Sequence, residues 1–331
     1  NNITMYALVK YGLLVLAVVA VLFGFLGILP YSGVQFLITL SLVVAACYVS
    51  NFLIAQILKA PTNSESWFIT SFILFFILAP VKNVDDGIIT IAAGMIAMAS
   101  KYILAFNKKH IFNPAAISIF LLGLFGIGNG IWWVGSLVLL PFVTVLGLMV
   151  VRKIRRFSMF FVFVGAAMST IILFNISNGV SPIESIKQVF ASWPLIFFGT
   201  IMLTEPLTTP PHRKLQMIYG GLVGILFGSQ FHIGPLFASP EFALVVGNIF
   251  SFIISPKYRL HLKLKKIQPI GKNLYEFIFE KNVPFTFPAG QYMEWTLSGF
   301  KPDLRGNRRY FTIASSPTES DIRLGVKIDK S

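Results

Sequence analysis

Two groups of residues in this 331-residue chain could do chemistry, and the first is the string Arg309-Tyr310-Phe311-Thr312 near the C-terminus. The Arg309 guanidinium offers a planar fork that matches a phosphate group. Phe311, two residues along the same strand face, offers an aromatic surface, and Thr312 offers a hydroxyl. Together these residue types suit a cofactor that carries both a phosphate and a flat ring. The alternative is an ordinary barrel strand with an arginine at its edge.

The second group surrounds Glu205, which lies in IMLTEPLTTPP at the point where an apolar segment breaks. A carboxylate at membrane depth is costly enough to mark a functional site. Thr208 and Thr209 supply hydroxyl oxygens of the kind that a hard cation binds. The alternative is an interfacial carboxylate that pairs with Arg213 or Lys214.

Composition indicates the elements that hold these residues. A hydrophobic fraction of 55% and a mean hydropathy of +0.76 exclude an ordinary soluble domain. About 20 consecutive apolar residues cross a bilayer. Breaks at charged residues, Pro and Gly predict ten segments, at 6–29, 33–58, 67–81, 86–106, 112–127, 131–151, 155–176, 190–205, 215–231 and 238–255. Lys101, within the fourth segment, is expected to extend toward lipid headgroups.

The charges indicate an orientation for these segments. Of the 27 Lys and Arg, 13 precede residue 257 and 14 lie from it onward, without a basic stripe, so nucleic-acid binding is not expected. If the chain crosses the membrane at each of the ten segments, ten Lys and Arg lie on the same side as the N-terminus. Two, Lys82 and Lys187, lie on the opposite side. By the positive-inside rule, the sequence predicts a multi-pass protein of the inner membrane, with its N-terminus and the domain 257–331 in the cytoplasm.

The membrane domain, 1–256, also repeats. Pro80 and Pro114 are 34 residues apart, as are Pro206 and Pro240, and the two pairs are offset by 126 residues. Each copy, about 1–129 and 130–256, holds five segments, so the second copy must be inverted. Short segments interrupted by Pro at corresponding places indicate a binding site between the repeats.

Two of these prolines follow residues that cap helices. Asn113 precedes Pro114 and Ser239 precedes Pro240, the pattern of an N-cap followed by Pro at the first helical position. Helices that start inside the membrane would present free N–H groups to an electron-rich ligand, such as a flavin ring or a quinone carbonyl. Ordinary interfacial caps are the alternative.

From Tyr258 the pattern changes to alternation over five short runs, which predicts an antiparallel β-barrel. FPAGQY at 287–292, RYFT at 309–312, the following IASSP, and LGVKI resemble the FAD-binding domain of the ferredoxin-NADP reductase family. The resemblance implies a flavin, FAD or FMN, bound by Gln291, Tyr292, Arg309, Tyr310, Phe311 and Thr312. Thr312 would hydrogen-bond near the reactive flavin N5, which makes it the expected catalytic residue. Relatives usually have Tyr where this chain has Phe311.

The same resemblance implies further elements after Ser331. A sixth strand, a helix and a domain that binds the nicotinamide donor, NADH or NADPH, would follow, so the chain is expected to be part of a longer protein. The single cysteine, Cys47, excludes a disulfide framework, a Cys-ligated iron–sulfur cluster and a structural zinc site. The four histidines do not share helices, so no haem is expected.

The membrane domain, with FNPAA in its first half and TEPLTTPP in its second, resembles the B subunit of sodium-pumping NADH:quinone reductases and the D subunit of Rnf complexes. Those relatives carry a covalent flavin on a threonine in an S-G-A-T-like loop, and no such string occurs here. A second, non-covalent flavin or a quinone is the expectation instead, with partner electron-transfer subunits left open.

The sequence therefore predicts a membrane-bound, flavin-dependent NAD(P)H oxidoreductase. Electrons would pass from the nicotinamide donor through the flavin to a membrane flavin or quinone, and coupled cation translocation is left open. The alternative is an inverted-repeat transporter or channel-like protein in which the flavin domain is regulatory.

Overall fold

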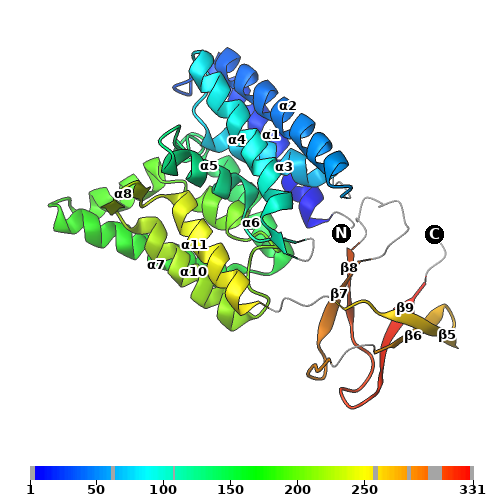
Figure 1. Cartoon of the computed structure of the whole chain (residues 1–331). Helices are drawn as coiled ribbons and strands as arrows, with labels where there is room; N and C mark the ends of the chain where they lie inside the picture. The colour runs from blue at the N-terminus through cyan, green and yellow to red at the C-terminus, as the bar shows by residue number, and fades with distance from the viewer. Residues whose placement is uncertain are drawn as a thin grey trace. The chain divides into compact units, whose positions relative to one another are not determined.

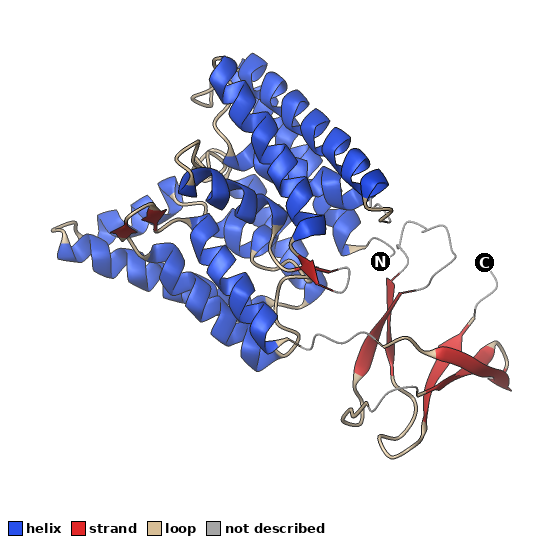
Figure 2. Cartoon of the chain, in the orientation of Figure 1, coloured by secondary structure: helices blue, strands red, loops and turns tan. Residues whose placement is uncertain are grey.

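The computed structural model describes residues 4–60, 64–106, 109–255, 260–281, 285–296 and 308–328. Two compact units make up the chain: a helical unit, Met5–Pro256, and a sheet-containing unit, Lys257–Ser331 together with Asn1–Thr4. Figure 1 traces both along the chain, and Figure 2 shows that helices dominate the first and strands the second.

The helical unit contains α-helices, a π-helical turn and two short hairpins. The helices are α1 (Met5–Phe25), α2 (Gly33–Ile57), α3 (Ser64–Ile77), α4 (Val84–Ile103), α5 (Pro114–Leu124), α6 (Leu140–Ile154), α7 (Phe157–Ser177), α8 (Pro182–Ser192), α9 (Leu195–Phe197), the π-helix η1 (Phe198–Met202), α10 (Arg213–Gly228) and α11 (Pro240–Ile254). The hairpins pair β1 (Ala105–Phe106) with β2 (Lys109–His110) and β3 (His232–Ile233) with β4 (Leu236–Phe237).

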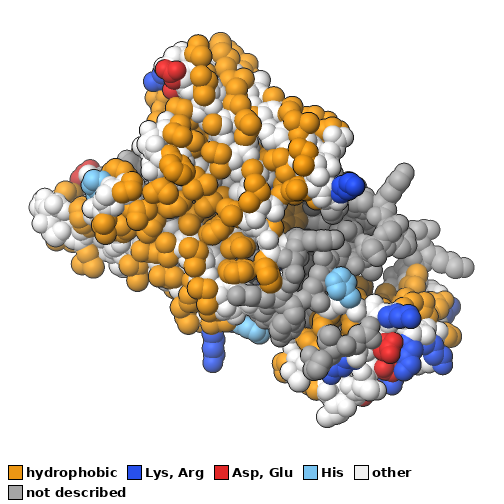
Figure 3. Space-filling model, in the orientation of Figure 1, with side chains coloured by type: hydrophobic (Ala, Val, Ile, Leu, Met, Phe, Trp, Pro, Cys, Tyr) orange, Lys and Arg blue, Asp and Glu red, His pale blue; other side chains and the backbone are white. Residues whose placement is uncertain are grey.

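Four of these helices, α1, α2, α4 and α7, are long and apolar enough to cross a membrane. The helices α3, α5 and α11 are apolar but shorter. Many large apolar side chains on the outside of this unit are exposed, and in the view of Figure 3 they cover most of its surface. A surface of this kind suits contact with lipid rather than water.

Helices lie within all ten predicted segments, with two corrections. The predicted segment 131–151 starts nine residues before the helix does, because α6 begins at Leu140. Before it, the main-chain N–H groups of Ile131 and Trp132 both donate to the Ile77 carbonyl oxygen, at 2.8 and 2.9 Å. Trp132 also has a left-handed backbone, with φ of 53°. The second correction is α8, which the pattern did not predict: Ser181 caps it and Pro182 occupies its first turn.

The order of elements occurs twice. Four helical elements, a two-stranded hairpin and a final helix make up α1 to α5, and the same order recurs from α6 to α11, with α8 inserted and α9–η1 in the place of α3. The equivalent helices α1 and α6 pack together, as do α5 and α11. The last pair is antiparallel, because the start of α5 at Asn113 contacts Asn248 whereas Phe120 contacts Phe242 near the start of α11.

The sheet-containing unit is small. Its strands are β5 (Lys263–Gly271), β6 (Leu274–Glu280), β7 (Tyr292–Thr296), β8 (Arg308–Thr312) and β9 (Asp321–Lys327). They form a three-stranded sheet, β5-β6-β9, and a two-stranded sheet, β7-β8, so the predicted closed barrel is not seen among the described residues. A core of Phe287, Ile313 and Ile322 is covered by half-buried side chains that include Met293 and Trp295.

Candidate functional site

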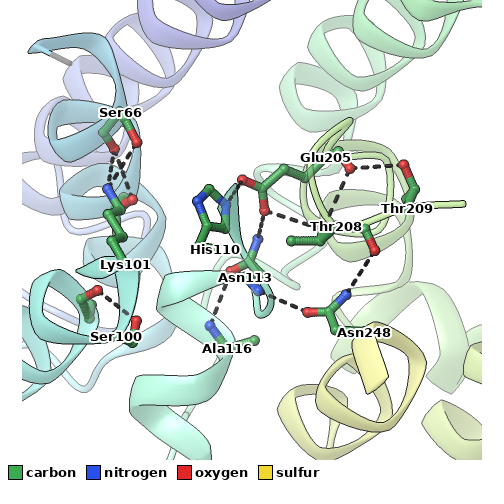
Figure 4. Close-up of polar contacts among 12 residues, drawn as sticks. Ser66, Ser100, Lys101, His110, Asn113, Ala116, Glu205, Thr208, Thr209 and Asn248 are labelled. Atoms are coloured by element: carbon green, nitrogen blue, oxygen red, sulfur yellow. Dashed lines mark hydrogen bonds and ion pairs between the residues drawn. The ribbon is translucent and has the colours of Figure 1, made fainter. Parts of the chain in front are cut away.

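Glu205 lies just beyond the π-helix η1, at the centre of a polar cluster inside the helical unit (Figure 4). Its Oε1 is 3.0 Å from His110 Nε2 at the end of hairpin β1–β2. Its Oε2 accepts a hydrogen bond of 2.9 Å from the Asn113 side-chain amide. The cluster therefore joins the break in the second half of the sequence to the FNPAA motif of the first half.

Asn113 connects this carboxylate to two helices. Its side-chain oxygen caps α5 by accepting from the Ala116 N–H, at 3.1 Å, while its amide nitrogen donates to Glu205. Its own main-chain N–H donates to Asn248 Oδ1 on α11, at 2.8 Å. Asn248, which is fully buried, also donates to the Tyr219 hydroxyl on α10, at 3.2 Å. Both polar atoms of the Asn113 side chain make a hydrogen bond, which fixes its orientation.

Thr208 and Thr209 lie in the same cluster, and their hydroxyls are directed at Glu205. The Thr209 hydroxyl donates to the main-chain oxygen of Glu205, at 2.9 Å. The Thr208 hydroxyl lies 3.5 Å from that main-chain oxygen and 3.5 Å from the carboxylate Oε2. Arg156 donates to the Thr209 hydroxyl and to the Thr204 carbonyl. The threonine hydroxyls thus stabilise the turn that carries Glu205.

The interfacial ion pair considered for Glu205 is not the one found. Among the described residues its ionic partner is His110, whereas Arg213 donates to the Ser158 hydroxyl, at 2.6 Å. Lys101 does not extend toward headgroups as expected: its Nζ donates to the carbonyl and hydroxyl oxygens of Ser66 on α3, at 2.9 and 3.0 Å. The charged groups of Glu205 and Lys101 are therefore both held inside the helical unit.

Ser239 is the one predicted residue of the membrane site that the fold keeps away from Glu205. It caps α11 by accepting from the Phe242 N–H, at 3.2 Å. Because α5 and α11 run antiparallel, this cap lies at the opposite end of the pair from Asn113. The buried Glu241 next to it accepts a hydrogen bond of 3.0 Å from the Trp132 indole.

A cavity of about 40 Å³ adjoins the cluster. Asn113 and Glu205 form one wall, Ser66 and Thr70 of α3 lie opposite, and α1 contributes Val9. A buried water needs roughly 10–15 Å³, so the cavity has room for about three water molecules. It is sized for water or a small ion rather than for a flavin or quinone ring.

The sheet-containing unit brings the two reductase-like motifs together. Strands β7 and β8 pair so that Tyr292 lies directly opposite Thr312 and Met293 opposite Phe311. Cross-strand partners share a face, so Tyr292 and Thr312, both exposed, lie on one face, and Phe311 lies on the other with Met293. The Gln291 carbonyl accepts from the Ile313 N–H, at 2.9 Å, which extends the pairing.

The side chains of Arg309 and Tyr310 lie outside the described residues. Their backbones are paired with Trp295 and Glu294 of β7. The predicted flavin-contacting strand and FPAGQY are therefore neighbours, while the predicted roles of individual side chains stay predictions.

Sequence reasoning missed two residues of the helical site, His110 and Asn248, and the buried Glu241 at the other end of α11. Each of the three carried a signal. Asn248 is a single amide in an apolar run, Glu241 follows the proline that starts α11, and His110 lies three residues before Asn113. Polar residues in apolar segments are rare and need partners, so their positions alone could have indicated a buried network.

Among the described residues, no group of three or more His, Cys, Asp or Glu side chains could hold a metal ion. Comparison with known proteins adds no identification. No protein-family model matches the chain, and no curated protein matches it either.

Proposed function

We propose that this chain is a membrane-bound flavoprotein oxidoreductase, which passes electrons from a nicotinamide donor through a flavin to a flavin or quinone in the membrane. The observation that carries the proposal is the pairing of β7 with β8, which sets FPAGQY beside RYFT. Consecutive strands commonly pair, and here the register brings the two motifs of the resemblance to one place, where a single ligand could contact both.

The helical unit supports the membrane part of the proposal. Its apolar exterior and its four long apolar helices suit a bilayer. The repeated order of elements and the antiparallel contact of α5 with α11 are what two inverted repeats would produce. The Glu205 cluster lies where the two copies meet, as the binding sites of inverted-repeat membrane proteins do.

The flavin site is assigned to the strand pair. Arg309 would bind the flavin phosphate, and the exposed Thr312 would hydrogen-bond the ring beside Tyr292. Gln291, Tyr310 and Phe311 complete the set, with Phe311 supporting the strand from its other face. When bound, the flavin supplies the electron-accepting chemistry that the chain's own side chains lack.

The test is the flavin content of the full chain, purified in detergent. Visible absorbance would detect bound flavin, and denaturation followed by chromatography would distinguish FAD from FMN. Arg309→Ala should weaken flavin binding by about tenfold or more, because a charge-assisted hydrogen bond contributes about 1.5–3 kcal/mol. Thr318→Val, which changes an exposed threonine in the nearby turn, should bind flavin normally. A purified chain that neither contains flavin nor takes it up would overturn the proposal.

A transporter or channel-like function is the second candidate, and the cavity beside Glu205 favours it. A space of about 40 Å³ next to a buried carboxylate suits a small ion better than an electron-carrying ring. Ion flux that persists in Arg309→Ala would support this reading, with the sheet-containing unit as a regulatory domain.

A further inference from the structure

We propose that the ion handled by the helical unit is a proton, relayed from His110 to Glu205 and across the adjoining cavity to Ser66 and Lys101. The inference rests on the proposed membrane function and names the ion for its coupled or alternative transport activity. It is carried by the contacts of Glu205, by the cavity beside it and by the inward position of Lys101.

The surroundings of Glu205 favour a proton over a metal cation. Hard cations need several oxygen ligands, usually six or more for calcium or magnesium. Here the carboxylate receives an amide N–H from Asn113 and faces the imidazole of His110, while the Thr208 hydroxyl lies 3.5 Å from its Oε2. A carboxylate in direct contact with an imidazole can gain and lose a proton.

The first transfer can occur without movement of the protein. His110 Nε2 and Glu205 Oε1 are 3.0 Å apart, within the range for direct proton transfer. The Nε2–H bond of the imidazolium breaks as an O–H bond forms on the carboxylate. An ion pair becomes a neutral imidazole and a neutral carboxylic acid, so net charge is conserved.

The second transfer crosses the cavity. Glu205 forms one wall and Ser66 another, and the volume holds about three water molecules. Lys101 Nζ lies 3.0 Å from the Ser66 hydroxyl oxygen and interacts electrostatically with Glu205. The carboxylic acid gives its proton to the water chain, which delivers one to the neutral amine of Lys101. Glu205 returns to the carboxylate and Lys101 becomes an ammonium.

Other charged and titratable groups face the cluster from each neighbouring element. Arg156, before α7, donates into the turn that follows Glu205, and Tyr219 on α10 accepts from Asn248. On α1, Lys10 pairs with Glu65 of α3, at 3.3 Å. Arg156 and His110 are therefore the basic groups held against the Glu205 segment, and the Lys10–Glu65 pair is neutral overall.

Labelling with dicyclohexylcarbodiimide tests the relay without relying on electron transfer. This reagent adds to a protonated carboxyl group in an apolar setting, and mass spectrometry of the full chain's peptides would locate the adduct. We expect Glu205 to be labelled at low pH and spared at high pH, with no protection by sodium chloride relative to choline chloride. In Lys101→Met and His110→Gln, labelling should extend to higher pH, because each variant removes a group that is positive once it holds the relayed proton.

The exposed pair Glu184 and Lys187 on α8 provides the control. Lys187→Met removes the same charge at an exposed position that pairs outside the cluster, and it should leave the labelling profile of Glu205 unchanged. Protection by sodium would overturn the proposal in favour of a metal-cation site. If neither His110→Gln nor Lys101→Met shifts the labelling profile of Glu205, the proposed coupling of Glu205 to these two residues is overturned. Either result leaves the flavin proposal standing, since flavin content is measured separately.

Discussion

At the scale of single residues, Asn113 makes three hydrogen bonds, each to a different part of the helical unit. It caps α5, donates to Glu205 and, through its main chain, contacts the buried Asn248. A residue with so many specific partners can be replaced only at a cost, because each lost bond leaves a buried group unsatisfied. Its position before Pro114 indicated the cap from sequence alone, but its contact with Glu205 depends on how the two halves pack.

Asn113→Ala is therefore expected to lower stability by about 2 kcal/mol or more, through the lost cap and the unpaired carboxylate. Thermal unfolding in detergent would measure the change. Ser181→Ala, which removes the cap of the more exposed α8, is the matched control and should cost about 1 kcal/mol at most. Equal losses in the two variants would show that the Glu205 contact adds nothing.

Glu205 itself should be dispensable for flavin binding. Glu205→Gln keeps the shape of the side chain but can no longer carry a proton. We expect normal flavin content and loss of proton uptake when the flavin is reduced in vesicles that enclose a pH-sensitive dye. Unchanged proton uptake in Glu205→Gln would contradict the assigned role of this carboxylate.

At the scale of elements, the broken helix α9–η1 and the middle of α6 position the site. The pattern predicted one segment over 190–205, and the structure has a short helix that widens into a π-turn before Glu205. The close contact of this turn with α6 requires Gly147, where any Cβ would overlap the Thr200 hydroxyl. Hydropathy identifies an apolar segment but does not report such breaks, since they follow from tertiary packing.

Gly147→Ala should consequently destabilise the helical unit by about 1–3 kcal/mol, as overpacking in a fitted core does. Gly165→Ala is the control, because a Cβ at that position of α7 meets open space. The control should unfold at the wild-type temperature or slightly above it. Thermal unfolding of both variants, followed by circular dichroism, would make the comparison. If Gly147→Ala is as stable as Gly165→Ala, α6 and η1 do not pack as closely as described.

The strands show a different limit on sequence reasoning. Alternation predicted the five strands, and the resemblance predicted that FPAGQY and RYFT belong to one site. The register of β7 and β8 then places Phe311 on the opposite face from Thr312. A period of two residues dictates this separation, so a flavin ring cannot lie on both side chains unless it reaches the strand's edge.

At the scale of the whole molecule, a helical unit with an apolar exterior and a sheet-containing unit make up the chain. The apolar segments were predictable because lipid requires long apolar surfaces, whatever the tertiary structure. The polar cluster was only partly predictable, since Glu205 and Asn113 each stood out but their contact crosses 92 positions of sequence. The insertion of α8 carried too weak an apolar signal to be recognised as a segment.

The predicted orientation can be checked with single cysteines. In a Cys47→Ala background, Lys187→Cys should react with an impermeant maleimide in intact cells, and Arg155→Cys should react only after permeabilisation. The reason is the excess of Lys and Arg on the side that holds Arg155. Labelling of both cysteines from the same side would contradict the ten-segment threading.

The central claim is that a flavin in this chain exchanges electrons with an acceptor in the membrane. The most direct measurement is the reoxidation of chemically reduced flavin by a membrane-soluble quinone, followed by visible absorbance without oxygen in vesicles that contain the full chain. We predict that the quinone restores the oxidised flavin spectrum in the wild type, with a smaller signal in Arg309→Ala, which binds flavin more weakly. A chain that holds no flavin, or a flavin that stays reduced in the presence of quinone, would contradict the account.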